Sequence, residues 1–179
     1  MMKPTSLPSY WRVPGVMEIC SVSTCINAPP EGWMNSWKHN HLGFFDTVLD
    51  ARAVVGKEAG RFVLFGYRLL PRVFVRGEAK PYDISASSIE TPSPSLLPIG
   101  YDAVSKSSSN FFECSPLSCN HMAGEIAGVN LYCLMDTLDE ALSLATRFSI
   151  EEPEPGPYYV LEVLREPKSP YATAAPRRR

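Results

Sequence analysis

The amino-acid sequence predicts an α+β domain with a mainly antiparallel or mixed sheet and with helices on one face of that sheet. Two observations lead to this class. Segments with strand-like and helix-like patterns alternate along the 179 residues, and one residue pattern occurs twice. Each copy of the pattern reads as a strand, a helix and a second strand. We therefore expect two βαβ-like halves related by approximate twofold symmetry.

The repeated pattern begins with a pair of cysteines. Cys20–Cys25 and Cys114–Cys119 both read Cys-Ser-x-x-Ser/Thr-Cys, and an asparagine follows each segment shortly afterwards. Two later pairs also match, Asn40 with Asn130 and Phe44–Thr47 with Leu134–Thr137. A duplicated half-domain explains these matches, with a longer loop in the first copy. The alternative is chance, because Asp-Thr is a common start signal for helices.

Composition indicates one domain with an irregular segment at each end. Hydrophobic residues make up 45% of the chain, enough for a sizeable core, and 17 prolines and 11 glycines indicate many turns. The expected ranges are a lead-in at 1–15, a domain at 16–166 with half-repeats at about 16–83 and 99–166 and a Ser/Pro-rich connector at 84–98, and a disordered tail at 167–179.

The clearest element of the first half is a strand over Arg61–Val75, which is rich in aromatic and branched residues. Pro71 is expected to end or bend this strand, because proline cannot donate to a ladder of hydrogen bonds. A helix is predicted before it. Asp46 or Thr47 caps that helix, and apolar residues follow at helical spacing over Val48–Val55.

Two further elements are predicted near the start of the chain. Val16–Ile26 is expected to form a strand, because apolar residues recur there among small polar ones. Glu31–His39 is expected to form a short helix, because Trp33 and Trp37 lie four residues apart and so share one helix face.

The second half contains the most strongly predicted helix. Thr137 and Glu140 form a capping box, in which each side chain accepts a hydrogen bond from the backbone amide of the other. An apolar stripe follows at helical spacing: Leu138, Ala141, Leu142, Ala145 and Phe148. Strands are predicted at Ile99–Lys106, Phe111–Cys114 and Tyr158–Leu164. The last of these is apolar on both faces, which is typical of an interior strand.

Charge is distributed unevenly between the two halves. The net charge of −2 argues against nucleic-acid binding by the whole surface. Residues 51–80 carry seven basic and two acidic side chains, whereas residues 113–166 carry ten acidic and two basic ones. These charges either attract each other across an internal interface, steer a charged partner protein, or lie on separate solvated faces.

The sequence favours the cytoplasm. No apolar stretch follows Lys3, so no secretory signal is predicted, and no apolar run is long enough to span a membrane. The five cysteines, an odd number, fit a reducing compartment.

The paired cysteines are the candidate metal site. Structural zinc takes four thiolate or imidazole ligands in a tetrahedron. Four cysteines supply that number, with a histidine as a substitute for one of them: Cys20, Cys25, Cys114, Cys119 and His121. In a strand, residues five apart point to opposite faces, which favours the alternative of buried structural thiols. The sequence assigns no role to His39 or His41.

The function that the sequence favours is a non-enzymatic module that binds one partner protein, such as an immunity or regulatory protein. The sequence contains no phosphate-binding glycine loop and no recognisable set of catalytic residues. Candidate contact residues are an aromatic pair and clusters of each charge: Trp33, Trp37, Arg68, Arg72, Arg76, Glu151, Glu152 and Glu154. No cofactor is expected for such a module.

Two alternatives stay open. One is a metal- or thiol-dependent enzyme, or a zinc-stabilised protein, that uses the paired cysteines. The other is a structural subunit of a larger assembly. None of these sequence patterns predicts the oligomeric state.

Overall fold

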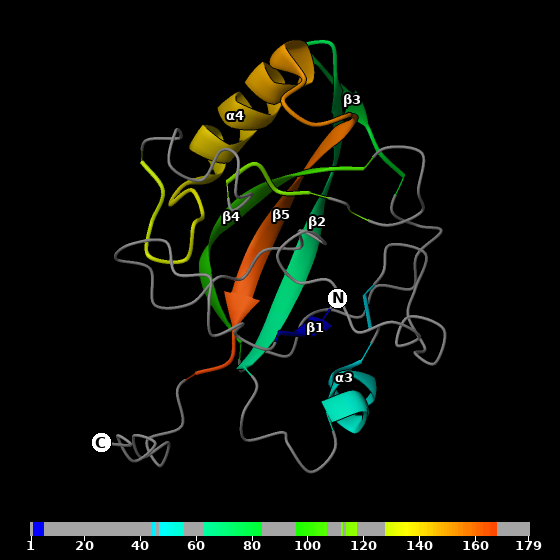
Figure 1. The fold of residues 1–179 in the computed structure, drawn as a ribbon, viewed down its shortest axis with the longest axis vertical. Coiled ribbons are helices and arrows are strands. Elements are labelled where there is room, and N and C mark those ends of the chain that lie inside the picture. Colours follow the sequence, from blue (N-terminus) through cyan, green and yellow to red (C-terminus); the bar gives the residue numbers. More distant parts are fainter. Residues whose placement is uncertain are drawn as a thin grey trace, which may run out of the picture.

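The computed structural model describes residues 2–5, 44–45, 47–55, 63–83, 96–106, 112, 114–117 and 128–167. Within these ranges the order is β1 (Met2–Thr5), α3 (Val48–Val55), β2 (Val63–Val75), β3 (Glu78–Pro81), β4 (Leu97–Ser105), α4 (Leu138–Glu151) and β5 (Tyr158–Arg165) (Figure 1). The elements expected at Val16–Ile26 and Glu31–His39 lie outside the described residues, as do most of the connector and the tail after Pro167.

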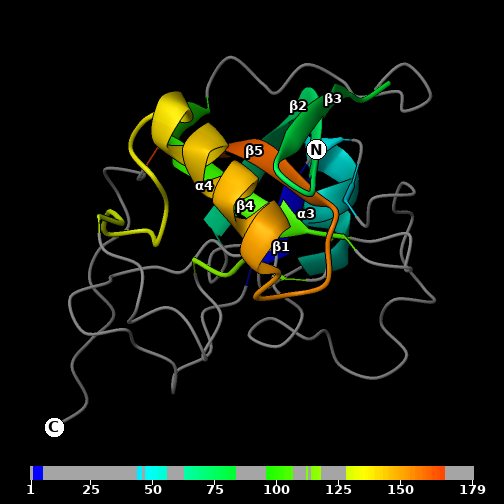
Figure 2. The same cartoon turned by 90° about the horizontal axis from the view of Figure 1, so that it is seen from above.

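The described strands form one antiparallel sheet. Its order is β1-β2-β5-β4, and β3 pairs with the end of β2 that β1 does not reach. Figure 1 shows β5 between β2 and β4, and Figure 2 shows α4 lying across these strands. The predicted α+β class with a mainly antiparallel sheet is therefore confirmed.

β5 is the interior strand of the sheet, as its two apolar faces predicted. It pairs with β2 along one side and with β4 along the other. Because successive side chains of a strand point to opposite faces, β5 contributes to two cores. Tyr158 and Val160 face α4, whereas Tyr159, Leu161 and Val163 face away from it.

Two hydrophobic cores lie on the two faces of the sheet. The helix-side core packs α4 onto the strands and contains Phe74, Ala103, Leu117, Met135, Ala141, Leu144, Ala145, Phe148, Tyr158 and Val160. The opposite core contains Phe44, Phe65, Tyr67, Leu69, Val104, Phe112, Leu134, Tyr159, Leu161 and Val163. The strands β2, β4 and β5 contribute to both cores, so the central sheet is covered on both faces.

β2 continues through Pro71 rather than ending there. Its pairing with β5 shifts in register between Leu69 and Val73, and the carbonyl of Pro71 accepts a hydrogen bond from the amide of Tyr82 at 3.0 Å. Proline has no amide hydrogen for the ladder. A local irregularity in the pairing therefore lets the strand accommodate it.

α4 begins with the predicted capping box. The Thr137 hydroxyl accepts a hydrogen bond from the Glu140 amide at 3.3 Å, and a Glu140 carboxylate oxygen accepts one from the Thr137 amide at 3.0 Å. Ala141, Ala145 and Phe148 of the predicted stripe are fully buried. Leu144 is buried with them, whereas the predicted Leu138 and Leu142 are only partly buried. The buried face is thus rotated slightly from the predicted stripe.

The start of α3 and the segment at Phe111–Cys114 test two further predictions. α3 starts as expected, because the Thr47 hydroxyl accepts a hydrogen bond from the Asp50 amide at 3.1 Å. The strand expected at Phe111–Cys114 lies partly outside the described residues, and within it Cys114 forms an isolated bridge with Ser105. In that bridge the Ser105 amide donates to the Cys114 carbonyl at 2.8 Å.

Asn130 organises the loop that leads into α4. Its side-chain oxygen accepts hydrogen bonds from the amides of Tyr132 at 2.9 Å and Leu134 at 3.2 Å. Its side-chain nitrogen donates to the carbonyl of Ile99 in β4 at 2.9 Å. The loop is therefore tied to the edge of the sheet by an asparagine that belongs to the repeated pattern.

Gly100 is required where this loop meets β4. Its φ is 145°, and a Cβ atom at this position would lie 2.7 Å from the Met135 carbonyl oxygen. We expect Gly100→Ala to lower the free energy of unfolding by roughly 3 kcal/mol, because it adds a steric clash to backbone strain. Urea denaturation measures this loss.

Gly128→Ala is the matched control for that substitution. Gly128 also has a positive φ, 88°, but a Cβ there would have no neighbour within 4 Å. Only backbone strain then remains, about 1 kcal/mol. Equal losses in the two variants would show that the contact between Gly100 and the loop contributes nothing.

Candidate functional site

The turn between β2 and β3 has an unusual residue for its geometry. Arg76 and Gly77 connect the paired residues Val75 and Glu78 with φ values of 49° and 81°. A two-residue turn with both φ values positive favours Asn-Gly or Gly-Gly. Glycine meets this requirement without strain, whereas arginine in the left-handed region costs about 1 kcal/mol.

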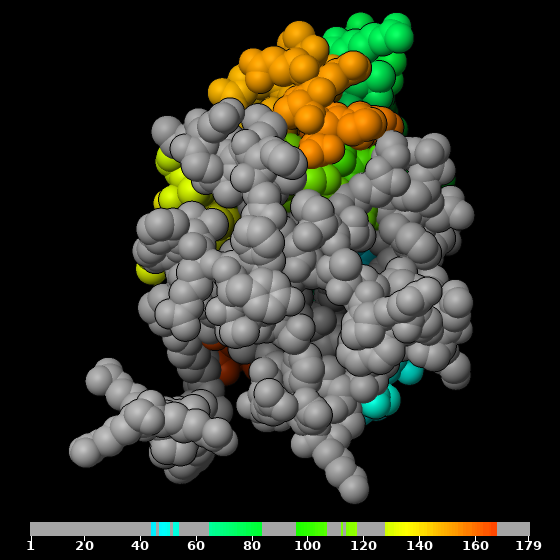
Figure 3. All heavy atoms as spheres, in the orientation of Figure 1, coloured from blue at the N-terminus to red at the C-terminus, as the bar shows by residue number. Residues whose placement is uncertain are grey.

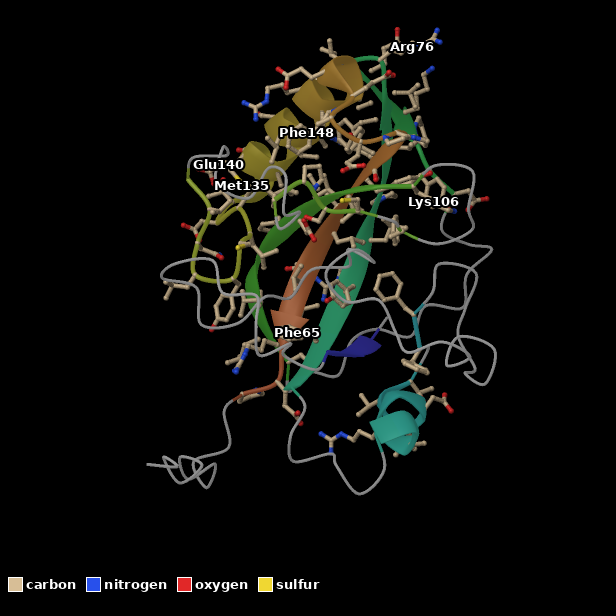
Figure 4. The ribbon with its side chains drawn as sticks, in the orientation of Figure 1. Phe65, Arg76, Lys106, Met135, Glu140 and Phe148 are labelled. Carbon is tan, nitrogen blue, oxygen red and sulfur yellow. The ribbon has the colours of Figure 1, made fainter. Side chains whose placement is uncertain are left out.

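This turn is docked on the last turn of α4. The Gly77 amide donates a hydrogen bond to the Ser149 hydroxyl at 2.8 Å, and that hydroxyl donates to the Thr146 carbonyl at 2.8 Å. Close approach explains the glycine, because a Cβ at Gly77 would lie 3.1 Å from Ile150. Figure 4 shows Arg76 at the tip of the hairpin, directed away from the sheet.

A cleft of about 200 Å³ lies where the hairpin turn, the end of α4 and the start of β5 meet. Apolar groups of Phe74, Pro157 and Tyr158 form part of its wall, and Arg76 and Glu152 contribute one charge of each sign. Figure 3 shows the hairpin and the end of α4 together on the molecular surface. We call the cleft together with Arg76, Ile150, Glu151 and Glu152 the tip surface.

The side chains at the carboxyl end of α4 carry charges of the sign that the helix dipole disfavours. The carboxyl end of a helix carries a partial negative charge, which favours basic side chains. No basic residue lies in the last turn of α4, and Glu151 and Glu152 lie at its end. Arg147 offsets this in part, through an ion pair with Glu151 at 3.6 Å between two exposed side chains. Glu152 itself has a left-handed backbone with a φ of 48°.

The structure brings together only some of the predicted contact residues. Arg76 and Glu152 line the same cleft, and Glu151 lies beside it. Arg68 instead forms an ion pair with Glu162 of β5 at 2.5 Å, and Arg72 is exposed on β2 outside the cleft lining. The backbone of Glu154 exchanges hydrogen bonds with the Tyr158 hydroxyl. Trp33 and Trp37 lie outside the described residues.

A second group of interacting polar side chains, which the sequence did not predict, is buried at the edge of β4. Asp102 is fully buried, and its Oδ1 accepts a hydrogen bond from the hydroxyl of the equally buried Ser115 at 2.5 Å. In the part of the chain that the structure describes, the other carboxylate oxygen, Oδ2, has no hydrogen-bond partner. The available signal was an acidic residue inside the otherwise uncharged run Ile99–Ser105.

Burial raises the pKa values of the ionisable side chains in this group. Loss of hydration raises the pKa of Asp102 to about 7, although the Ser115 hydroxyl and the Ala103 amide act in the opposite direction. Burial and the nearby charge of Asp102 raise the pKa of the Cys133 thiol to about 11. A thiol that rarely ionises is a poor nucleophile and a poor metal ligand.

The proposed metal ligands are only partly within the described chain. Cys114 is buried, as the structural-thiol interpretation predicted. Cys20, Cys25, Cys119 and His121 lie outside the described residues. Across the ranges that the structure describes, no group of three or more His, Cys, Asp or Glu side chains is placed to hold a metal ion.

Comparison with known proteins does not extend these observations. No protein-family model matches the sequence, and neither the curated proteins nor the solved structures yield a significant match. In the described part of the chain, none of the helices combines the length and apolar character that a membrane crossing requires.

Asp102 should make the protein less stable as the pH rises. The folded carboxyl keeps its proton up to about pH 7, whereas the unfolded one releases it near 3.8. Between these values the folded state binds more protons, so raising the pH lowers the free energy of unfolding, by up to about 4 kcal/mol. In Asp102→Asn this contribution disappears, which urea denaturation across the same pH range measures.

Wild type serves as the reference in that comparison, because all other carboxyl groups titrate in both proteins. The difference between the two stability curves therefore isolates Asp102. Parallel curves from about pH 4 to pH 8 would contradict the burial argument.

Cys133 should be protected from alkylation in the folded protein. Its side chain is 1% exposed, and its raised pKa leaves about a hundredfold less thiolate than an ordinary cysteine has. We expect iodoacetamide to modify Cys133 at least about a hundredfold more slowly in the folded protein than in urea. Mass spectrometry of the peptide that contains Cys133 measures both rates. Rapid modification of the folded protein would instead identify an accessible, ionised thiol.

Proposed function

We propose that the chain is a non-enzymatic, cytoplasmic interaction module that binds one partner protein through its tip surface. The observation that supports this most strongly is a concentration, at one end of the fold, of features that do not stabilise the fold itself. Regulation or inhibition of the partner, as by an immunity protein, is the role that such a small module suits.

Three features of the tip surface conflict with local stability. Arg76 has a left-handed backbone where glycine or asparagine would be unstrained. Glu151 and Glu152 lie at the negative end of a helix. Ile150 keeps 65% of its surface exposed beside the hairpin turn. Conflicts of this kind between sequence and local structure are expected where residues serve binding.

The tip surface has the character of a protein-binding site. Its cleft of about 200 Å³ has a wall that is partly apolar and partly polar, and it can receive a single side chain of a partner. Charges of both signs lie at this cleft, and neither Arg76 nor Glu152 forms an ion pair with another described residue. Such charges provide orientation and select the partner by complementarity.

We also propose that the domain arose by duplication of one half. The segments β1-α3-β2 and β4-α4-β5 have the same order of elements, and β2 and β5 are antiparallel neighbours with β1 and β4 outside them. The helices α3 and α4 both begin after a threonine whose hydroxyl accepts from the amide three residues later. This arrangement supports an approximate twofold symmetry, but its first strand differs from the predicted one: β1 lies in the expected irregular lead-in at 1–15, and Val16–Ile26 lies outside the described residues.

The binding proposal is tested by affinity capture from the native host. We expect the wild type to recover one partner protein in stoichiometric amount. We expect Arg76→Gly and Glu152→Gln each to recover at least about tenfold less, because central contact residues typically contribute more than 1 kcal/mol. Quantitative mass spectrometry measures the recovered partner.

Two comparisons separate lost binding from lost folding. Arg76→Gly relieves backbone strain and should raise the free energy of unfolding by about 1 kcal/mol while it weakens capture. Arg52→Ala removes an exposed charge of α3, whose partner is the exposed Glu166, and should leave capture unchanged. Capture at wild-type level by both tip variants would contradict the proposed surface. Turnover of a small molecule, with no stoichiometric partner, would contradict the function.

A further inference from the structure

The buried carboxyl of Asp102 is poorly prepared to carry a charge. An ionised carboxylate offers about four acceptor sites, and water fills them at the surface. Among the described residues, the Ser115 hydroxyl donates to Oδ1, the Ala103 amide also favours the charged form, and Oδ2 receives no hydrogen bond. The groups that face it are also unable to balance a negative charge. Its neighbour in β5 is the apolar Leu161, and the described titratable group near it is the thiol of Cys133. The neutral acid is therefore the form that this site accepts.

Ser115 belongs to the segment Cys114–Leu117, which lies against the outer edge of β4. Two of its contacts with the strand are described: the Ser105 amide donates to the Cys114 carbonyl, and the Ser115 hydroxyl donates to Asp102. Leu117 holds the segment further by packing in the helix-side core.

A neighbouring loop contacts the same edge of β4. Tyr101 and Met135 exchange two backbone hydrogen bonds, at 2.8 and 2.9 Å, and the Asn130 side chain adds a third contact to β4. Of the two segments on this edge, Cys114–Leu117 is the one that donates to the Asp102 carboxyl, so its separation is the one that admits water to that carboxyl.

We propose that Asp102 is a proton-binding site whose protonation holds the segment Cys114–Leu117 against the edge of β4. Separation of Ser115 admits water to the carboxyl, and hydration stabilises the ionised form. Proton release and separation are therefore linked. At low pH the carboxyl stays neutral and the segment stays docked. As the pH rises, the separated state gains in population.

The pH range of this effect follows from the two environments. The docked carboxyl releases its proton at about pH 7, and a hydrated one near 3.8. The separated fraction should therefore increase up to about tenfold per pH unit within this window, and it should level off above pH 7. Between about pH 5 and pH 7 the total increase is roughly 50-fold.

One backbone amide reports this separation directly. The Ser105 amide donates to Cys114, whereas the Tyr101 amide of the same strand donates to Met135 in the neighbouring loop. Hydrogen exchange followed by NMR gives a protection factor for each amide after correction for the intrinsic rate. We expect the Ser105 protection factor to fall roughly 50-fold from about pH 5 to pH 7, and the Tyr101 factor to fall much less.

Two variants complete the test. Asp102→Asn should abolish the pH dependence at Ser105, because the amide does not titrate. Ser115→Ala should lower the Ser105 protection factor at every pH and retain its dependence on pH, which keeps the test decisive if Asp102→Asn does not fold. A constant Ser105 protection factor in the wild type would overturn the proposal. An equal fall at Ser105 and Tyr101 would also overturn it, since that result assigns the proton release to unfolding of the whole domain.

Discussion

The fold depends on the burial of β5 on both of its faces. This strand pairs with β2 on one side and with β4 on the other, and its alternate side chains enter the two cores. The first half of the chain supplies β2, and the second half supplies β4 and β5. Neither half can therefore complete its core alone, because an interior strand needs a neighbour on each side and a covering layer on each face. Substitutions in Val160 or Leu161 would consequently affect both halves at once.

The same strand positions the tip surface. β5 begins at Tyr158, which lies in the wall of the cleft and also in the helix-side core, with its ring centroid 5.7 Å from that of Phe148 in α4. The Tyr158 hydroxyl fixes the preceding turn through the backbone of Glu154. The cleft is therefore an extension of the core packing and not a gap between independent loops. A surface built in this way is preorganised, and preorganisation limits the entropy that a protein loses on binding.

The sequence predicted those elements whose signals are local. The capping box at Thr137, the apolar faces of Tyr158–Leu164 and the aromatic run over Arg61–Val75 each specify one element, and each is confirmed. Signals that depend on tertiary contacts were missed. Asp102 reads as an ordinary exposed residue until Ser115, thirteen positions later, covers it. The charge of Arg76 makes it a candidate contact residue, but Arg-Gly lacks the usual signal for this turn and so does not predict the left-handed backbone.

The buried acid also has a structural consequence for the sheet. β4 is an edge strand, and an edge with unpaired amides and carbonyls can pair with a strand of another chain. Met135 and Cys114 cover this edge by single bridges at Tyr101 and Ser105. Between them, Asp102 places a carboxyl inside the fold, where an invading strand would leave it ionised and without Ser115. An ionisable side chain that points inward is related to the inward-pointing charged residues that protect natural edge strands. The residue that lowers stability near neutral pH thus opposes wrong association through the same edge.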